Sequence, residues 1–154
     1  MTFIHKHDIP SNKKVSYANM VCSYRPLKEE KYRTWLTIGG DVLEYLDISS
    51  SPAASQLESK LIINGMISDA HLGARFMTAD LKDYFLQSLL LEPEYLRIHG
   101  RYLLLNIREE YNINELIASD GYVYCKIVKG MYGLKQVAKL ARNQLVDNLR
   151  KHGY

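Results

Sequence analysis

The sequence has few cysteines and no long run of apolar residues. Cys22 and Cys125 are the two cysteines among 154 residues and no Cys-x-x-Cys pair occurs, which excludes a zinc knuckle or a dithiol redox motif. We expect two buried free thiols in a reducing, intracellular environment, cytoplasmic or nuclear. No segment approaches the roughly 20 apolar residues that a membrane span requires, and no targeting segment precedes the first motif, so we expect no membrane partner.

An excess of charge of one sign is also missing. The net charge is +3, with 24% charged and 47% hydrophobic residues, a globular composition that argues against a disordered or low-complexity chain. A charge of this size does not indicate nucleic-acid binding, which depends on Lys and Arg clustered against phosphates. The aromatic residues are uneven, with twelve Tyr against three Phe and one Trp. The Tyr side chain has an apolar ring and a polar hydroxyl, which suits partly hydrated surfaces, so this bias favours a binding face.

The first residues show no hydrophobic periodicity. Residues 1–14 are predicted to form a disordered or extended N-terminal arm. His5 and His7 in this arm could bind a metal, but solvated side chains are favoured because no third ligand is near in sequence. Residues 15–154 have the length of one compact domain.

Strands and helices alternate along that domain, which predicts the α+β class. Two strands are expected around a turn at Arg25-Pro26, one beginning at Val15 and one formed by Tyr32–Ile38. A helix is expected to open at Ser51-Pro52 and to run up to Gly73. Its apolar face would consist of Ala54, Leu57, Leu61, Ile62 and Met66.

The segment after this helix is predicted to place an aspartate at the end of a strand. Residues 75–81 form a short apolar-rich run after a glycine, which indicates a buried strand ending near Asp80. A helix from Lys82 to about Leu91 would follow, with Pro93 beyond its end.

The C-terminal third has the clearest patterns. Residues 95–98 are a candidate strand, residues 101–118 a partly helical excursion, and Ser119-Asp120-Gly121 a turn. Residues 121–128 alternate as a half-buried strand, with Val123, Cys125 and Ile127 on one face. A helix over 137–152 follows, capped at Gly153, with Ala138, Ala141, Leu145 and Leu149 on its apolar side.

Asp80 is the candidate metal ligand. Phosphoryl transfer from a nucleoside triphosphate needs Mg²⁺ held by carboxylates, and a carboxylate at a strand end is well placed for this. A further carboxylate is required, and the sequence contains no Asp-Asp pair. Asp80 could instead cap the helix that follows. Asp83 could be a second ligand, but on a helix it would point away from Asp80, which favours a solvated residue or a helix-dipole partner.

Two further segments carry candidate nucleotide contacts. In the turn over 133–136, Lys135 could donate to a phosphate and Gln136 could reach a sugar or base, although a purely structural turn is equally compatible. The second segment is a basic strip beside aromatic residues. This mixture is suited to phosphate contact and base stacking on single-stranded nucleic acid, but it is also compatible with a solvated strand face. Its members are Lys28, Lys31, Tyr32, Arg33 and Trp35.

Three blocks, in this order, resemble the reverse transcriptases of copia-type retrotransposons. They are RTWLTIGG at 33–40, FMTADLKDYF at 76–85 and YCKIVKGMYGLKQ at 124–136, and the similarity extends over about 15–154. The resemblance implies a partial reverse-transcriptase fold, with the fingers and the first part of the palm of an RNA-directed DNA polymerase. It also implies Mg²⁺ as cofactor, with an RNA/DNA template-primer and deoxynucleoside triphosphates as partners.

The resemblance assigns roles to single residues. Asp80 matches the first metal-binding aspartate of the palm, and Leu81 matches the neighbour whose backbone carbonyl can join the same metal. Phe85 matches the aromatic residue that screens the sugar 2′-hydroxyl. Gln136, with Lys135 beside it, would line the nucleotide pocket. Either Lys31 or Arg33 would face the triphosphate.

The chain also departs from the family pattern. Trp35 stands where the family tends to have a basic residue, Gln87-Ser88-Leu89 is unusual after the aspartate block, and Lys139 with Arg142 replaces an apolar and aromatic pattern. In the family, the Asp-Asp hairpin, the thumb and the ribonuclease H domain follow the point reached at Tyr154. We therefore expect an incomplete polymerase fold, inactive alone.

Two alternatives to a catalytically incomplete fragment stay open. The chain could act as a non-catalytic nucleic-acid-binding or interaction module derived from a retroelement, or its reading frame could continue beyond Tyr154. An open sheet edge in the partial palm would also favour self-association.

Overall fold

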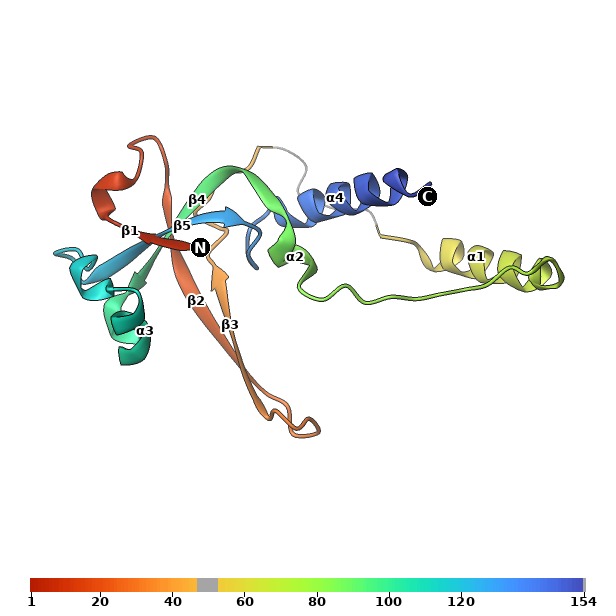
Figure 1. The fold of residues 1–154 in the computed structure, drawn as a ribbon, viewed down its shortest axis with the longest axis horizontal. Helices are drawn as coiled ribbons and strands as arrows, with labels where there is room; N and C mark the ends of the chain where they lie inside the picture. The colour runs from red at the N-terminus through yellow and green to blue at the C-terminus, as the bar shows by residue number, and fades with distance from the viewer. Residues whose placement is uncertain (47–52, 154) are drawn as a thin grey trace.

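The computed structural model describes residues 1–46 and 53–153, which form a mixed α+β fold around one five-stranded sheet (Figure 1). This confirms the predicted class, α+β, without defining a specific polymerase fold. The strand order in the sheet is β1-β5-β4-β2-β3. The strands are β1 (Thr2–Ile4), β2 (Val15–Tyr24), β3 (Tyr32–Ile38), β4 (Leu89–His99) and β5 (Tyr122–Lys129). The α-helices are α1 (Gln56–Ser68), α2 (Tyr84–Gln87), α3 (Leu105–Glu110) and α4 (Val137–Lys151).

The predicted pair of strands around Arg25-Pro26 is confirmed as an antiparallel hairpin. Strands β2 and β3 pair from Ala18 opposite Ile38 to Tyr24 opposite Tyr32. The backbone N–H of Arg25 closes the turn by donating to the carbonyl of Lys31 at 2.6 Å. Only the first part of β2, residues 15–17, pairs with β4, in parallel. The rest of the hairpin therefore projects beyond the sheet (Figure 1).

The segment around Asp80 differs most from the prediction. Residues 75–81 are exposed and form no strand, so the expected buried strand is wrong. The following helix is also wrong in length, because α2 has four residues and β4 begins at Leu89. Pro93 lies inside β4, at an irregularity between Leu89 and Glu94 where β4 pairs with β5, and a bulge is where a strand accommodates proline. The apolar run 89–91 thus enters the sheet.

Helix α1 begins later than expected. The predicted start at Ser51-Pro52 lies outside the described residues, and the observed N-cap is Ser55. Ser55 and Glu58 form a capping box, in which the Glu58 N–H donates to Ser55 Oγ at 3.2 Å. No residue of α1 is buried, and the exposed fraction of Leu61 is 60%. The expected apolar face therefore faces solvent, and Figure 1 shows α1 lying apart from the sheet.

The first residues of the N-terminal arm form an edge strand of the sheet. Strand β1 pairs antiparallel with β5, so that Phe3 lies opposite Cys125. Beyond it, the Lys6 ammonium lies 2.8 Å from Asp120 Oδ2, and the Tyr124 hydroxyl donates to the same oxygen at 2.7 Å. Within residues 1–14, only Thr2–Ile4 is a strand, and Lys6–Asp8 forms a short 3-10 helix.

The core lies between the sheet and the segment that leads into α4. Strands β4 and β5 contribute side chains that are fully or almost fully buried, and the loop after β5 covers them. The cluster consists of Ile38, Leu43, Leu96, Ile98, Cys125, Ile127, Met131, Leu134 and Val137. The predictions of a strand at 121–128 and a helix at 137–152 are confirmed as β5 and α4.

The burial of Cys22, Tyr124 and Leu149 differs from the sequence-based expectation. Cys125 is buried as expected, but Cys22 is exposed on the projecting hairpin. Tyr124 is buried although it lies on the more polar face of β5, because the Lys6 and Asp120 pair covers it. Leu149 stays 43% exposed, since α4 extends beyond the sheet. Within the described ranges, none of the helices has the length and apolarity to cross a membrane.

Candidate functional site

The first and third motif blocks meet at two glycines. The Ile38 N–H donates to the Tyr132 carbonyl at 2.9 Å. A Cβ atom added to Gly133 would lie 2.0 Å from the Ile38 carbonyl oxygen, and Gly133 has a φ of +99°, a conformation that favours glycine. A Cβ atom on Gly40 would in turn lie 2.0 Å from the Gly133 carbonyl oxygen. The two backbones therefore pass at a separation that only glycine permits.

The second and third blocks meet in the same way. The Gly130 N–H donates to the Ser88 carbonyl at 2.7 Å, and a Cβ atom on Gly130 would lie 1.9 Å from the Phe85 carbonyl oxygen. The rings of Phe85 and Tyr132 meet edge to face, with centroids 5.9 Å apart. The structure therefore brings all three blocks together, although about 35 residues separate the first from the second and the second from the third.

A groove of about 400 Å³ opens where the first and third blocks meet. We name it the aromatic groove, and its lining residues are Val21, Arg33, Trp35, Thr37 and Tyr132. The Arg33 guanidinium lies over the Trp35 ring, 5.0 Å from its centroid. A cation on one ring beside a second ring offers partners for a phosphate and for a base. Tyr132 was not singled out from the sequence, although its place next to Gly133 in the third block was a usable signal.

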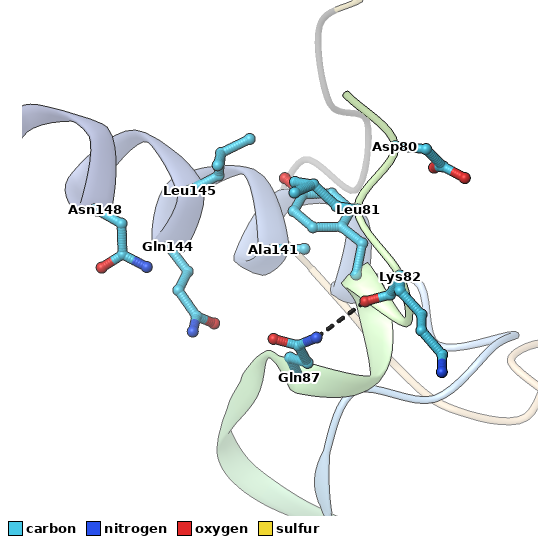
Figure 2. Close-up of a pocket in the computed structure, with 9 residues that line it drawn as sticks. Asp80, Leu81, Lys82, Gln87, Ala141, Gln144, Leu145 and Asn148 are labelled. Carbon is cyan, nitrogen blue, oxygen red and sulfur yellow. Dashed lines mark hydrogen bonds between the residues drawn. The ribbon is translucent and has the colours of Figure 1, made fainter. Parts of the chain in front are cut away.

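Asp80 and Leu81 lie in a separate hollow of about 360 Å³ beside α4. The hollow is lined by Asp80, Leu81, Lys82, Tyr84, Gln87, Ala141, Gln144, Leu145 and Asn148. The Gln87 side-chain amide donates to the Lys82 carbonyl at 2.9 Å and ties α2 to the preceding turn. Figure 2 shows the Asp80 carboxylate directed away from α4 and from the amides of Gln144 and Asn148.

The surroundings of Asp80 do not by themselves fit a magnesium ion. Among the described residues that line its hollow, Asp80 is the one carboxylate, and Mg²⁺ requires an octahedral set of oxygen ligands. Across residues 1–46 and 53–153, no three His, Cys, Asp or Glu side chains are grouped to hold a metal. The capping alternative for Asp80 is wrong, because the N-cap of α2 is Asp83. Asp83 has a left-handed backbone, with φ of 53°, and its side chain makes no capping hydrogen bond.

Lys135 and Gln136 are directed toward the protein. The Lys135 ammonium donates to the Leu43 carbonyl at 3.1 Å. Gln136 is 9% exposed, and its amide donates to Glu94 at 2.9 Å. Burial raises the pKa of Glu94, and the hydrogen bond from Gln136 opposes that rise. Gln136 thus lines a third hollow, of about 260 Å³, with Glu94, and neither the aromatic groove nor the hollow at Asp80 includes it.

The predicted basic strip divides between two faces of the hairpin. Strand alternation places Arg33 and Trp35 together on the face of the aromatic groove, while Tyr32 points to the other face. The rings of Tyr32 and Tyr24 lie 5.2 Å apart there. Lys31 is exposed just before β3, where its carbonyl accepts from Arg25. Of the predicted triphosphate contacts, Arg33 lines a groove and Lys31 lies nearer the hairpin tip.

We compared the chain with family models, with curated proteins and with solved structures, and none of the three comparisons finds a match. Its function is therefore inferred from the order of the three motif blocks and from the contacts that join them.

Proposed function

We propose that this chain is part of a copia-type retrotransposon reverse transcriptase, in which residues 15–154 correspond to the fingers and the first part of the palm. The observation that carries the proposal is the meeting of the three motif blocks at Gly40, Gly133 and Gly130. Blocks that form one nucleotide site are expected to be neighbours in space. These contacts leave no room for even one methyl group, so the blocks can lie this close only if glycine occupies each of these positions.

The aromatic groove is the element that binds nucleotide in this proposal. Arg33 supplies a positive charge for phosphate, and the rings of Trp35 and Tyr132 supply faces for a base. Phe85 packs against the Tyr132 ring and holds it in place. Lys135 and Gln136 act by fixing the turn through Leu43 and Glu94.

In this proposal the chain binds an RNA/DNA template-primer but does not extend it alone. Asp80 supplies one carboxylate, and phosphoryl transfer depends on several positioned charges around the reacting phosphate. Magnesium enters only as the ion used by the family, and its further ligands would have to come from another polypeptide segment.

The single tryptophan of the chain provides the test. Trp35 lines the aromatic groove, so its fluorescence reports on that groove alone. We expect an RNA/DNA template-primer with a matching deoxynucleoside triphosphate to quench it, and Arg33→Gln to weaken the response by about tenfold, since a hydrogen bond from a charged group is lost. Arg150→Gln, on the far end of α4, is the matched control and should leave the response unchanged.

Two results would count against the proposal. An unchanged Trp35 signal at saturating template-primer would remove the groove as a nucleotide site. An equal response to a single strand without a primer terminus would favour the alternative function, a non-catalytic nucleic-acid-binding module.

A further inference from the structure

A further hollow, of about 400 Å³, lies where strand β2 separates from β4. The two strands pair only over residues 15–17 of β2, after which β2 continues in the hairpin with β3. We name this hollow the fork cleft. It is lined by Tyr17, Ala18, Asn19, Met20, Leu36, Arg97, Ile98, His99, Arg101, Tyr102 and Tyr122. Leu36 lines the fork cleft and its neighbour Trp35 lines the aromatic groove, so the two sites lie on opposite faces of β3.

Two arginine side chains and three aromatic rings contact one another along one wall of the fork cleft. The Arg97 guanidinium lies over the Tyr122 ring, 4.8 Å from its centroid, and the His99 ring meets the same ring at 5.0 Å. His99 also meets Tyr102 at 6.2 Å. The Arg101 guanidinium lies 4.8 Å from the Tyr102 centroid and donates to its hydroxyl at 2.7 Å. Five side chains from β4, β5 and the segment after β4 thus form one continuous series of contacts.

The two guanidinium groups keep their charge available for a ligand. In the part of the chain that the structure describes, neither Arg97 nor Arg101 forms an ion pair with a carboxylate. By contrast, Lys6 and Lys13 in the adjoining hollow are both paired with acidic side chains. Arg97 and Arg101 are exposed, and Tyr102 is 51% exposed, so that both charge and ring surface reach solvent.

We propose that the fork cleft binds single-stranded nucleic acid. Bases would stack on Tyr102 and Tyr122, and phosphates would contact Arg97 and Arg101. A duplex keeps its base faces stacked inside, so it could use the two charges but not the rings. An acidic peptide could also use the charges, but it has no flat faces to match the rings. The proposal concerns a face of the sheet outside the aromatic groove and does not depend on the proposed function.

The test is fluorescence anisotropy of labelled oligo(dT) and oligo(U) of about 12 nucleotides over a range of salt concentrations. For the variant Arg97→Gln/Arg101→Gln we expect weaker binding and a log Kd against log salt slope that is shallower by about 1.4, roughly 0.7 for each lost phosphate contact. The variant Arg150→Gln/Lys151→Gln removes the same charge from α4 and should keep the original slope. Tyr102→Leu should weaken binding about tenfold without changing the slope, and Tyr102→Phe should restore it.

These binding measurements can be distinguished from the fluorescence test of the aromatic groove. The fork variants should retain the Trp35 fluorescence response, which reports on the other face of β3. Tighter binding of either oligonucleotide than of a blunt duplex supports the proposal, and the ratio of the two affinities says whether DNA or RNA is preferred. Equal slopes for the fork and α4 variants, or a duplex bound as tightly as a single strand, would overturn it. Far-UV circular dichroism and thermal unfolding of each variant confirm that the fold is retained.

Discussion

Gly40 approaches Gly133 so closely that a Cβ atom on Gly40 would lie 2.0 Å from the Gly133 carbonyl oxygen. Gly40 ends the block that carries Arg33 and Trp35, and Gly133 belongs to the block that carries Tyr132. The separation of the two walls of the aromatic groove is therefore fixed by backbone atoms. Backbone contact defines the groove more rigidly than flexible side chains would.

The first prediction concerns these glycines. Gly40→Ala introduces crowding only, and we expect it to lower the free energy of unfolding by about 1–3 kcal/mol. Gly133→Ala adds backbone strain at a φ of +99° and should cost about 2–4 kcal/mol. Urea unfolding measures both. Gly65→Ala in α1 is the control, because nothing lies within 4 Å of its Cβ position and alanine favours a helix. Equal urea midpoints for Gly65→Ala and Gly133→Ala would contradict the close contact between Gly133 and the Ile38 carbonyl.

Local patterns predicted those elements whose periodicity is undisturbed. The hairpin at Val15–Tyr24 and Tyr32–Ile38, strand β5 and helix α4 all follow from spacing and turn residues. The prediction for residues 75–91 was wrong, because a short apolar run does not distinguish a strand from a helix or an irregular segment. There the pairing of β4 with β5 and the bond from Gly130 to Ser88 decide the outcome.

The sequence named candidate site residues but did not predict their arrangement in space. The motif blocks nominated Asp80, Phe85 and Arg33 as candidates, yet the structure places Asp80 and Arg33 in different hollows. Partners such as Leu43 for Lys135 and Glu94 for Gln136 are distant in sequence, and no spacing rule finds them. Contacts of this kind depend on tertiary packing.

The second prediction concerns the pH dependence of stability through Asp120. A hydrogen bond from Lys6, and to a smaller extent one from Tyr124, holds the pKa of Asp120 well below its ordinary value of 3.8. A lowered pKa in the folded state means that the stabilisation is present above pH 3.8 and is lost as the pH falls further. The difference in unfolding free energy between wild type and Asp120→Asn should therefore be constant at about pH 5–7 and narrow below 3.8. Lys6→Gln should reduce that difference, and a difference that persists unchanged in strong acid would contradict the assignment.

The third prediction separates the two thiols. Cys22 is exposed, whereas burial raises the pKa of Cys125 to about 12. Because the thiolate is the reactive form, a thiol reagent at about pH 8 should modify one cysteine in the native chain and two after unfolding in urea. Cys22→Ser should abolish the native reaction. Two reactive thiols in the folded wild type would show that the core around Cys125 is open.

The fourth prediction is the absence of polymerase activity in the isolated chain. On an RNA template with a DNA primer, Mg²⁺ and deoxynucleoside triphosphates, we expect no incorporation by the wild type or by Asp80→Ala, since the described residues around Asp80 supply no second carboxylate. Asp147→Ala on α4 serves as the matched control. Incorporation that Asp80→Ala abolishes and Asp147→Ala does not would prove the inactivity claim wrong.

Photo-crosslinking tests the proposed nucleotide groove most directly. An RNA/DNA template-primer with 5-iodo-deoxyuridine at the primer 3′ end is irradiated with the chain, and the crosslinked peptides are identified by mass spectrometry. We predict crosslinks at Trp35 and Tyr132, which line the aromatic groove, and their loss in Arg33→Gln. Crosslinks confined to other surfaces, or equally strong in Arg33→Gln, would contradict a nucleotide site where the three motif blocks meet.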